Sequence, residues 1–191
     1  MFFPPLNSLH IQRKSSKNVS HFRVDVFIPN ENQVGGFSMC SAPSVMKSDS
    51  KLQLAIKYSS WPPSNWVHKR GKVGDKLAIR AGGNFFYDPP LTEKMPNLTL
   101  IAGGVGINPL LSILLHLSTK LAAGSNVENF PEHMTLLYSA KSKEEILFQV
   151  NKCDNFIFLY NFALCNFVFQ GYHLRLENQT EIFYCPLLCN G

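Results

Sequence analysis

The first half of the chain alternates apolar and polar side chains over short stretches that end at glycine or proline. Strict alternation is typical of half-buried strands, so we expect strands in FRVDVFIP (22–29), KLQLAIKYSS (51–60) and KLAIR (76–80). GGFSMCSAP (35–43) begins with two glycines and ends in a Ser-Ala-Pro turn, and WPPSNWV (61–67) predicts a proline-broken corner or a short helical turn. Short strands at this spacing predict a small antiparallel barrel or sandwich.

The pattern changes at Pro96. LTLIA (98–102) is a continuous apolar run, which is typical of a parallel strand covered on both faces. Leucines then recur at helical spacing over 110–123. A second apolar run, MTLLYSA (134–140), leads into KSKEEILFQ (141–149), the predicted start of another helix. This order of strands and helices predicts part of a parallel α/β sheet, so the fold class is β + α/β.

The two ends of the chain differ from its middle. The N-terminal residues are basic, rich in serine and free of acidic side chains, which is typical of an organelle transit peptide or its remnant, and equally of an ordinary basic arm. The C-terminal residues are rich in Phe and Asn without a clear period, so we interpret them as a divergent tail or a divergent strand pair. We predict four parts: an arm (1–21), an incomplete barrel (22–95), the N-terminal part of an α/β domain (96–150) and the tail (151–191).

Composition excludes several classes of protein. A hydrophobic fraction of 45% with 16% charged residues indicates a globular core. The net charge of +5 is scattered outside the arm, which argues against a nucleic-acid partner. The longest apolar stretch (156–169) is too short for a membrane span and is interrupted by two asparagines. The five cysteines lack zinc spacing, so we expect free thiols in a reducing compartment and no metal site.

The most informative stretch is the glycine-rich segment between the predicted strand and helix. Glycines let a backbone turn sharply and approach a ligand closely, and a helix N-terminus offers free amides and a positive dipole to a phosphate. An Asn-Pro pair is suited to the N-cap and the first helical position. The segment predicts either a phosphate loop for a dinucleotide or a plain strand-to-helix turn. Its residues are Gly103, Gly104, Val105, Gly106, Ile107, Asn108 and Pro109.

This segment departs from the standard G-x-G-x-x-G fingerprint. Counted from Gly104, the third glycine is replaced by Pro109. Lys141 and Lys143 stand after the second predicted strand, where an acidic residue would hold the ribose of NAD. The sequence therefore leaves both NAD and NADP open.

Taken in order, four motifs resemble the ferredoxin–NADP reductase superfamily. They are GFSMCS (36–41), VGDKLAIRAGGNFF (73–86), IAGGVGINPLLSIL (101–114) and LLYSAKSKEEILF (136–148), and the resemblance covers residues 22–149. In that superfamily a Gly-Ile-Thr/Asn-Pro ending replaces the third glycine. The resemblance implies a short antiparallel flavin-type β-barrel followed by a parallel α/β nucleotide-binding domain.

The resemblance also implies cofactors and roles for individual residues. FAD would lie against the barrel, NAD(P)H would enter over the glycine segment, and hydride would pass between the two cofactors. Ser38 matches a serine near the reactive flavin nitrogen and is the candidate catalytic residue, while Phe37 stands where a tyrosine stacks on the ring. The implied flavin-binding residues are Phe37, Ser38, Cys40, Ser41 and Ser64.

Some positions depart from the family pattern. Gly35 stands where an arginine grips the flavin phosphate, and Trp61 replaces a glycine before Ser64. The tail lacks the family's C-terminal motifs, so we expect a shortened form with impaired catalysis. The function that follows is a flavin-linked NAD(P)H oxidoreductase with an unknown electron acceptor. The alternative is a non-catalytic truncated form that binds a nucleotide weakly or acts through protein contacts. We expect a mitochondrial location, with the cytoplasm as the alternative.

Overall fold

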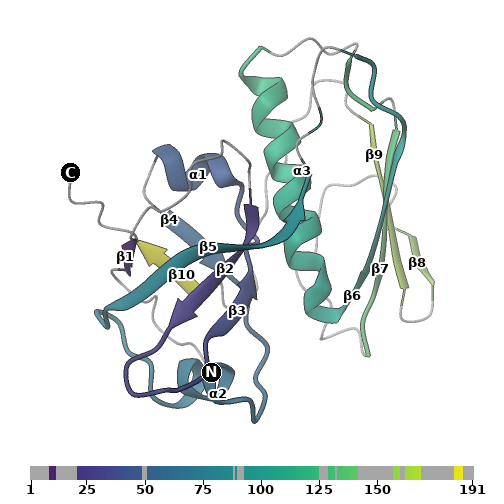
Figure 1. The fold of residues 1–191 in the computed structure, drawn as a ribbon. Coiled ribbons are helices and arrows are strands. Elements are labelled where there is room, and N and C mark those ends of the chain that lie inside the picture. Colours follow the sequence, from purple (N-terminus) through teal and green to yellow (C-terminus); the bar gives the residue numbers. More distant parts are fainter. Residues whose placement is uncertain are drawn as a thin grey trace.

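The structure is a computed structural model of the chain. It describes residues 9–11, 21–48, 51–87, 89, 93–124, 129–131, 133–141, 157–159, 162–168 and 183–186. Figure 1 shows two groups of strands with the long helix α3 (Ile107–Ala122) between them. Each group has its own buried hydrophobic cluster. This arrangement confirms a barrel-type β part followed by an α/β part.

The first half forms a four-stranded sheet in the order β1-β5-β2-β3. β2 pairs antiparallel with both β3 and β5, as the alternating pattern predicts. Val24 and Val26 are buried in the core, while the alternating residues Arg23 and Asp25 lie on the outer face. The strands of this sheet are β1 (Leu9–Ile11), β2 (His21–Phe27), β3 (Gly35–Ser38) and β5 (Leu77–Phe86).

The strand predicted over 51–60 is shorter than expected, since β4 (Lys51–Leu54) ends at Leu54. The next three carbonyls do not join a sheet ladder. They bond instead to side chains: Asn108 Nδ2 to Ala55 O, His68 Nε2 to Ile56 O and Ser64 Oγ to Lys57 O, at 2.7, 2.8 and 2.7 Å. Alternation alone does not reveal this use of the backbone.

Two helices and one further strand complete this half. A short helix, α1 (Pro43–Ser48), was not predicted, whereas α2 (Pro62–Lys69) is the helical form of the expected proline-rich corner. β10 (Phe183–Pro186), from the predicted tail, pairs antiparallel with β4. The tail therefore contributes a strand to the barrel half.

The second half is built on the parallel pair β6 (Leu98–Gly103) and β7 (His133–Ser139), which α3 connects. β9 (Phe162–Val168) pairs antiparallel with β7, and β8 (Ile157–Leu159) pairs with β9. The helix predicted to follow β7 lies outside the described residues. The two runs predicted to be parallel strands are confirmed.

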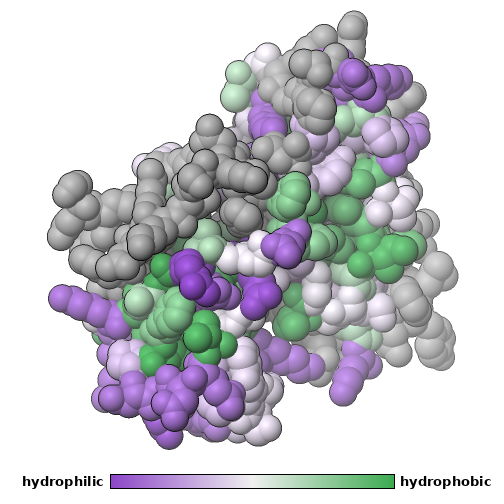
Figure 2. Space-filling model, viewed as in Figure 1, coloured by the Kyte–Doolittle hydropathy of each residue, from purple (hydrophilic) through white to green (hydrophobic). Residues whose placement is uncertain are grey.

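One expectation about β6 is wrong. The continuous apolar run predicts burial on both faces, but only Leu100 and Ala102 are buried, and Ile101 between them is 74% exposed. Figure 2 shows hydrophobic surface over both halves of the molecule. An apolar run reports hydrophobicity, not coverage, so the open face of β6 could not be derived from it.

α3 is the central element of the molecule. Leu114 and Leu117 are fully buried, and the same cluster includes Cys40 from the barrel half and Met134 from β7. Among the described residues, one helical segment (104–122, mean hydropathy 1.3, 44% buried) is long and apolar enough to cross a membrane, a property that core helices of globular proteins share. Its position between two sheets is that of a core helix (Figure 1).

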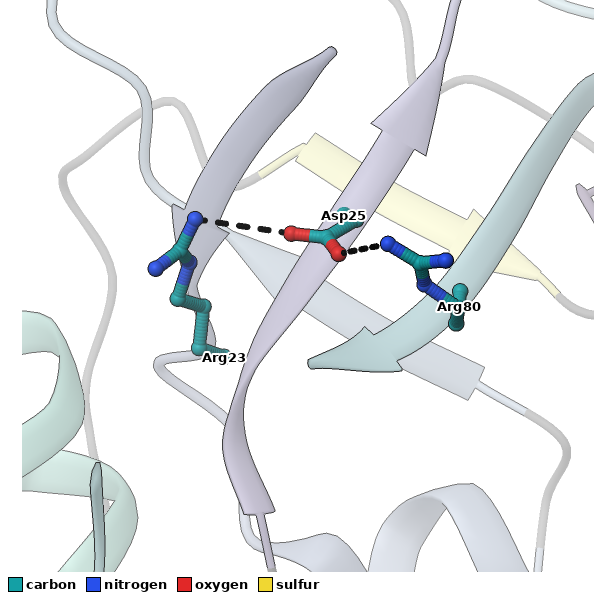
Figure 3. A network of polar contacts seen from close by, with 3 residues as sticks. All are labelled: Arg23, Asp25 and Arg80. Atoms are coloured by element: carbon teal, nitrogen blue, oxygen red, sulfur yellow. Dashed lines mark hydrogen bonds and ion pairs between the residues drawn. The ribbon is translucent and has the colours of Figure 1, made fainter. Parts of the chain in front are cut away.

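The outer face of the barrel sheet carries an ion network (Figure 3). Asp25 Oδ2 lies 2.8 Å from Arg80 Nη2, and Asp25 Oδ1 lies 3.5 Å from Arg23 Nη2. A Cβ at Gly36 would clash with the Arg23 guanidinium, and one at Gly82 would meet the Asp25 carboxylate at 2.7 Å. These glycines therefore provide the room that the network needs.

Candidate functional site

The glycine segment forms an open loop at the start of α3. Gly103 ends β6 in an extended conformation (φ −125°, ψ 124°), and Gly104–Gly106 make one 3₁₀ turn before α3 begins. Gly104 has φ +49°, which a residue with a side chain adopts only with strain. A Cβ built at Gly103, Gly104 or Gly106 would meet no atom of the described residues within 4 Å. The glycines thus border open space and not a packed wall, as a ligand-binding loop requires.

The backbone at this point favours an anion. The first amides of a helix have no partner within the helix, and the aligned peptide dipoles place partial positive charge there. No acidic side chain lies in the first turn of α3, and no side chain caps it. Ile107 N already donates to Gly104 O and Pro109 has no N–H, so this end of α3 offers a phosphate its dipole and the remaining amides of the first turn.

Asn108 does not act as the predicted N-cap. The helix begins two residues earlier than predicted, at Ile107, and Gly106 takes the cap position. The Asn108 side chain is 3% exposed and donates to Ala55 O across the junction of the two halves, which leaves its Oδ1 buried without a partner among the described residues. A tertiary hydrogen bond has replaced the local one. Asn108 thereby ties the loop to the barrel.

The other residues of this segment differ in how far they are buried. Ile107 is buried in the cluster around α3 and fixes the loop to the core. Val105 is 39% exposed on the rim, and Pro109, half-buried in the first turn of α3, has no N–H to offer. The seven residues predicted to bind a nucleotide thus run from the end of β6 through the 3₁₀ turn into the first turn of α3.

On the barrel side, Phe37 and Ser38 lie at the end of β3 and are both half-buried. The Phe37 ring packs edge-on against Trp61, with 5.7 Å between ring centroids and 61° between planes. Ser38 lies opposite Arg23 in the β2–β3 register, on the other side of β3 from Phe37. Both residues are partly exposed, but they lie on opposite faces of β3, and Phe37 also packs against the barrel core.

Cys40 and Ser41 are internal residues in this structure. Both are 2% exposed, and Ser41 is held from two sides, because Gln53 N donates to its Oγ and Ser112 Oγ donates to its carbonyl at 2.5 Å. Burial raises the pKa of the Cys40 thiol from 9.0 to about 12. The thiol is therefore neutral at physiological pH, and both side chains serve the packing between barrel and α3.

Ser64 is also committed to internal contacts. Its Oγ donates to Lys57 O at 2.7 Å and accepts from Ser59 N at 3.1 Å, and the residue is 2% exposed. α2 begins with Pro62 and Pro63, which have no N–H, and Asn65 N already donates to Trp61 O at 2.9 Å. This helix start therefore offers a phosphate little more than the amide of Ser64.

The position of the family's phosphate-binding arginine also differs from the family pattern. A Cβ at Gly35 would lie 2.5 Å from the Phe37 ring and 3.0 Å from Pro63 Cβ, so the space of the family arginine is filled. The three arginines whose side chains the structure describes are each paired with a carboxylate: Arg23 and Arg80 with Asp25, and Arg70 with Glu31. Within the described part of the chain, the residues around Gly35 do not fit the phosphates of FAD.

Two further observations complete the site. No group of three or more His, Cys, Asp or Glu that could hold a metal ion occurs among the described residues. The Asn108 and Ser112 contacts to the barrel were missed by sequence reasoning. Two polar residues one turn apart in an apolar helix were the signal that could have revealed them.

The fold is of the ferredoxin–NADP⁺ reductase type. Ferredoxin–NADP⁺ reductase from Plasmodium falciparum, solved with 2'P-AMP, superposes with a TM-score of 0.53 and 20% identity over 69% of this chain and 53% of that one. The Amycolatopsis cytochrome P450 reductase GcoB superposes with a TM-score of 0.50 and 20% identity, over 67% of this chain and 36% of that one. At these identities the likeness concerns the fold.

Sequence relatives are more specific. The chain is 48% identical over 133 residues to the Oxidoreductase NAD-binding domain-containing protein 1 of Pongo abelii, and 45% identical over 126 residues to that of Danio rerio. The matches cover 69% and 66% of this chain but 43% and 47% of the relatives, so the chain spans less than half of their length. No family model matches. The resemblance predicted from the motifs is confirmed.

Proposed function

We propose that this chain binds NAD(P) at Gly103–Pro109 as the nucleotide-binding part of a flavin-linked NAD(P)H oxidoreductase. The observation that carries the proposal is the open space beside Gly103, Gly104 and Gly106 at the N-terminus of α3. The pyrophosphate would lie there, against the first amides of a sixteen-residue helix. The names of the sequence relatives, which contain the words oxidoreductase and NAD-binding, support the same proposal.

The chain's own residues would bind and orient the nucleotide. The glycines admit the pyrophosphate, Ile107 anchors the loop, and Asn108 holds it against Ala55 of the barrel. Bound NAD(P)H supplies a hydride at its nicotinamide ring. Ser38 remains the candidate for a polar contact near the acceptor of that hydride.

The proposal is tested by titrating the full chain with NADH or NADPH and following nicotinamide fluorescence. Gly103→Val is the decisive variant, because Gly103 has extended backbone angles and open space around it. The valine fits the fold but projects into the space proposed for the ligand, so we expect binding to weaken at least about tenfold. Unchanged binding by a folded Gly103→Val variant would contradict the proposal.

A matched control lies at the other end of the same helix. Gly124 follows α3 with φ +86°, so Gly124→Ala costs about 1 kcal/mol of stability through its backbone. It does not touch the proposed site, and we expect its nucleotide affinity to equal that of the unmodified chain. The pair separates loss of binding from loss of stability.

The second candidate function is a non-catalytic form that binds a nucleotide or acts through protein contacts. The internal hydrogen bonds of Ser41 and Ser64 and the filled space at Gly35 favour it. Nucleotide binding without oxidation of NADH in the presence of added flavin or ferricyanide would support this candidate. The electron acceptor and the mitochondrial location stay proposals, the latter resting on the basic N-terminal arm.

A further inference from the structure

β6 lies at one edge of the second sheet. In the order β6-β7-β9-β8 it pairs with β7 on one side, and no described strand pairs with it on the other. An edge strand presents a row of backbone N–H and C=O groups that point away from the sheet and can bond to another strand. The fold therefore leaves such a row along Leu98–Gly103.

The side chains of β6 differ between the two faces of the sheet. Leu100 and Ala102 lie in the core beside α3, which covers one face (Figure 1). Thr99, Ile101 and Gly103 alternate with them on the other face, and all three are exposed. At 74%, Ile101 is the most exposed large hydrophobic side chain of the described residues. A strand added at this edge would cover part of Ile101, so burial of apolar surface would add to the backbone hydrogen bonds.

β6 carries none of the usual features that keep an edge strand from pairing with another molecule. Such features are an outward lysine, a proline, a β-bulge or a covering helix or loop. Leu98–Gly103 contains no charged residue and no proline, and its register with β7 runs without a shift. The exposure of Ile101 shows that the face away from α3 is uncovered at this point. The edge is therefore open to a further strand.

Charge and symmetry favour a second copy of this chain as the source of that strand. Between Lys94 and Lys120 the sequence contains no Lys, Arg, Asp or Glu, so two β6 edges can meet without like charges in the pair. A two-fold axis perpendicular to the sheet makes the two strands antiparallel and keeps α3 of both copies on the same face. The Ile101 side chains of both copies then lie on the other face, each beside the added strand.

We propose that β6 is a self-association surface at which two copies of this chain pair antiparallel through Leu98–Gly103. The two four-stranded sheets would thereby join into one continuous sheet. This inference goes beyond the proposed function and does not rest on it, because the surface consists of a strand edge and the Ile101 side chain. Nucleotide binding at the glycine loop is measured separately.

The first experiment measures the mass of the full chain by light scattering after size exclusion, over a range of protein concentrations. A single strand pair makes a small interface, so we expect a rise from one copy to two with a dissociation constant of about 1–100 μM. A mass of one copy up to about 1 mM would overturn the inference. Assemblies larger than two copies would also overturn it, because a two-fold pair closes on itself.

Ile101→Lys tests the surface, because it introduces the outward lysine that protects natural edge strands. We expect dimerisation to weaken at least about thirtyfold. Thr99→Lys, at a second exposed position on the same face, should act in the same direction. Val73→Lys is the matched control: it adds the same charge at a partly exposed aliphatic residue of the barrel half, and its dissociation constant should not change. Equal weakening by Ile101→Lys and Val73→Lys would overturn the assignment to β6.

Hydrogen exchange shows where the two copies meet. Above the dissociation constant, amides of β6 should exchange more slowly than below it, while those of β2 should exchange equally at both concentrations. Equal exchange of β6 at both concentrations would overturn the inference. Either the copies would then meet at another surface, or the edge would be covered within one chain.

Discussion

Ser112 carries a hydroxyl group in the leucine-rich helix α3. This hydroxyl forms a hydrogen bond from α3 to the barrel half. It is fully buried and donates to the Ser41 carbonyl of the barrel. Ser112→Ala leaves that carbonyl unpaired, so we expect the free energy of unfolding to fall by about 1–3 kcal/mol in urea titrations. Ser44→Ala is the control, because its exposed 3.4 Å contact to Thr119 across the same junction should cost less than about 0.5 kcal/mol. Equal losses would contradict this account.

We expect Cys40, at the junction of the two halves, to make the free energy of unfolding depend on pH. Below pH 9 its thiol is protonated in both the folded and the unfolded chain. Between pH 9 and 12 the unfolded thiol ionises while the folded one, with its pKa of about 12, stays protonated, so unfolding releases a proton and stability falls as pH rises.

The measurement compares the unmodified chain with Cys40→Ala at several pH values. From about pH 8 to about pH 10.5 the unmodified chain should lose roughly 1–2 kcal/mol relative to the variant. All other titrating groups are common to both proteins and cancel in the difference. A constant difference across this range would show that Cys40 does not carry the effect.

Single residues also show how far the sequence predicts the site. The position of the glycine loop between a strand and a helix followed from its three glycines and the apolar runs on either side, whereas nucleotide binding there is the proposal made above. The role of Asn108 did not, since its side chain serves a tertiary contact to Ala55 in place of the local cap. The closure of Gly35 by the Phe37 ring likewise depends on a side-chain direction that no pattern encodes.

At the scale of the element, a substitution at the start of α2 distinguishes a structural role of Ser64 from a role in phosphate binding. Ser64 makes two internal hydrogen bonds at its start. Ser64→Ala should lower the free energy of unfolding by about 2 kcal/mol and leave riboflavin, FMN and FAD affinities in their original ratio. Ser60→Ala, at an exposed position just before the helix, should change neither quantity. A selective loss of FMN and FAD binding in Ser64→Ala would instead make Ser64 a phosphate ligand.

Elements differ in how well their patterns predicted them. β2 and α3 follow their apolar periodicity because both bury one face against a core. β4 is shorter than its pattern, because the carbonyls of residues 55–57 bond to side chains from α2 and α3. The alternation of apolar residues continues through that segment although the ladder does not. Periodicity thus predicts the position of a strand, and contacts from other elements decide where the strand ends.

At the scale of the whole molecule, α3 serves both halves at once. Its N-terminal end continues from the glycine loop at which we propose that a nucleotide binds, its leucines fill the α/β core, and Asn108 and Ser112 donate to barrel carbonyls. Cys40 from the barrel half lies in the same cluster as Leu114. A boundary drawn between the two parts by composition therefore crosses a shared core. We infer that the halves unfold as one cooperative unit.

Leu114→Ala tests this coupling, because the two halves carry separate spectroscopic signals. Both tryptophans, Trp61 and Trp66, belong to the barrel half, whereas the far-ultraviolet helix signal comes mainly from α3. Leu114 is fully buried, so the alanine variant should lose about 3 kcal/mol. With a shared core, the tryptophan transition shifts to lower urea by the same amount as the helix transition. A tryptophan transition that stays in place while the helix transition shifts would mean that the barrel half is stable without α3 and that the two halves are independent units.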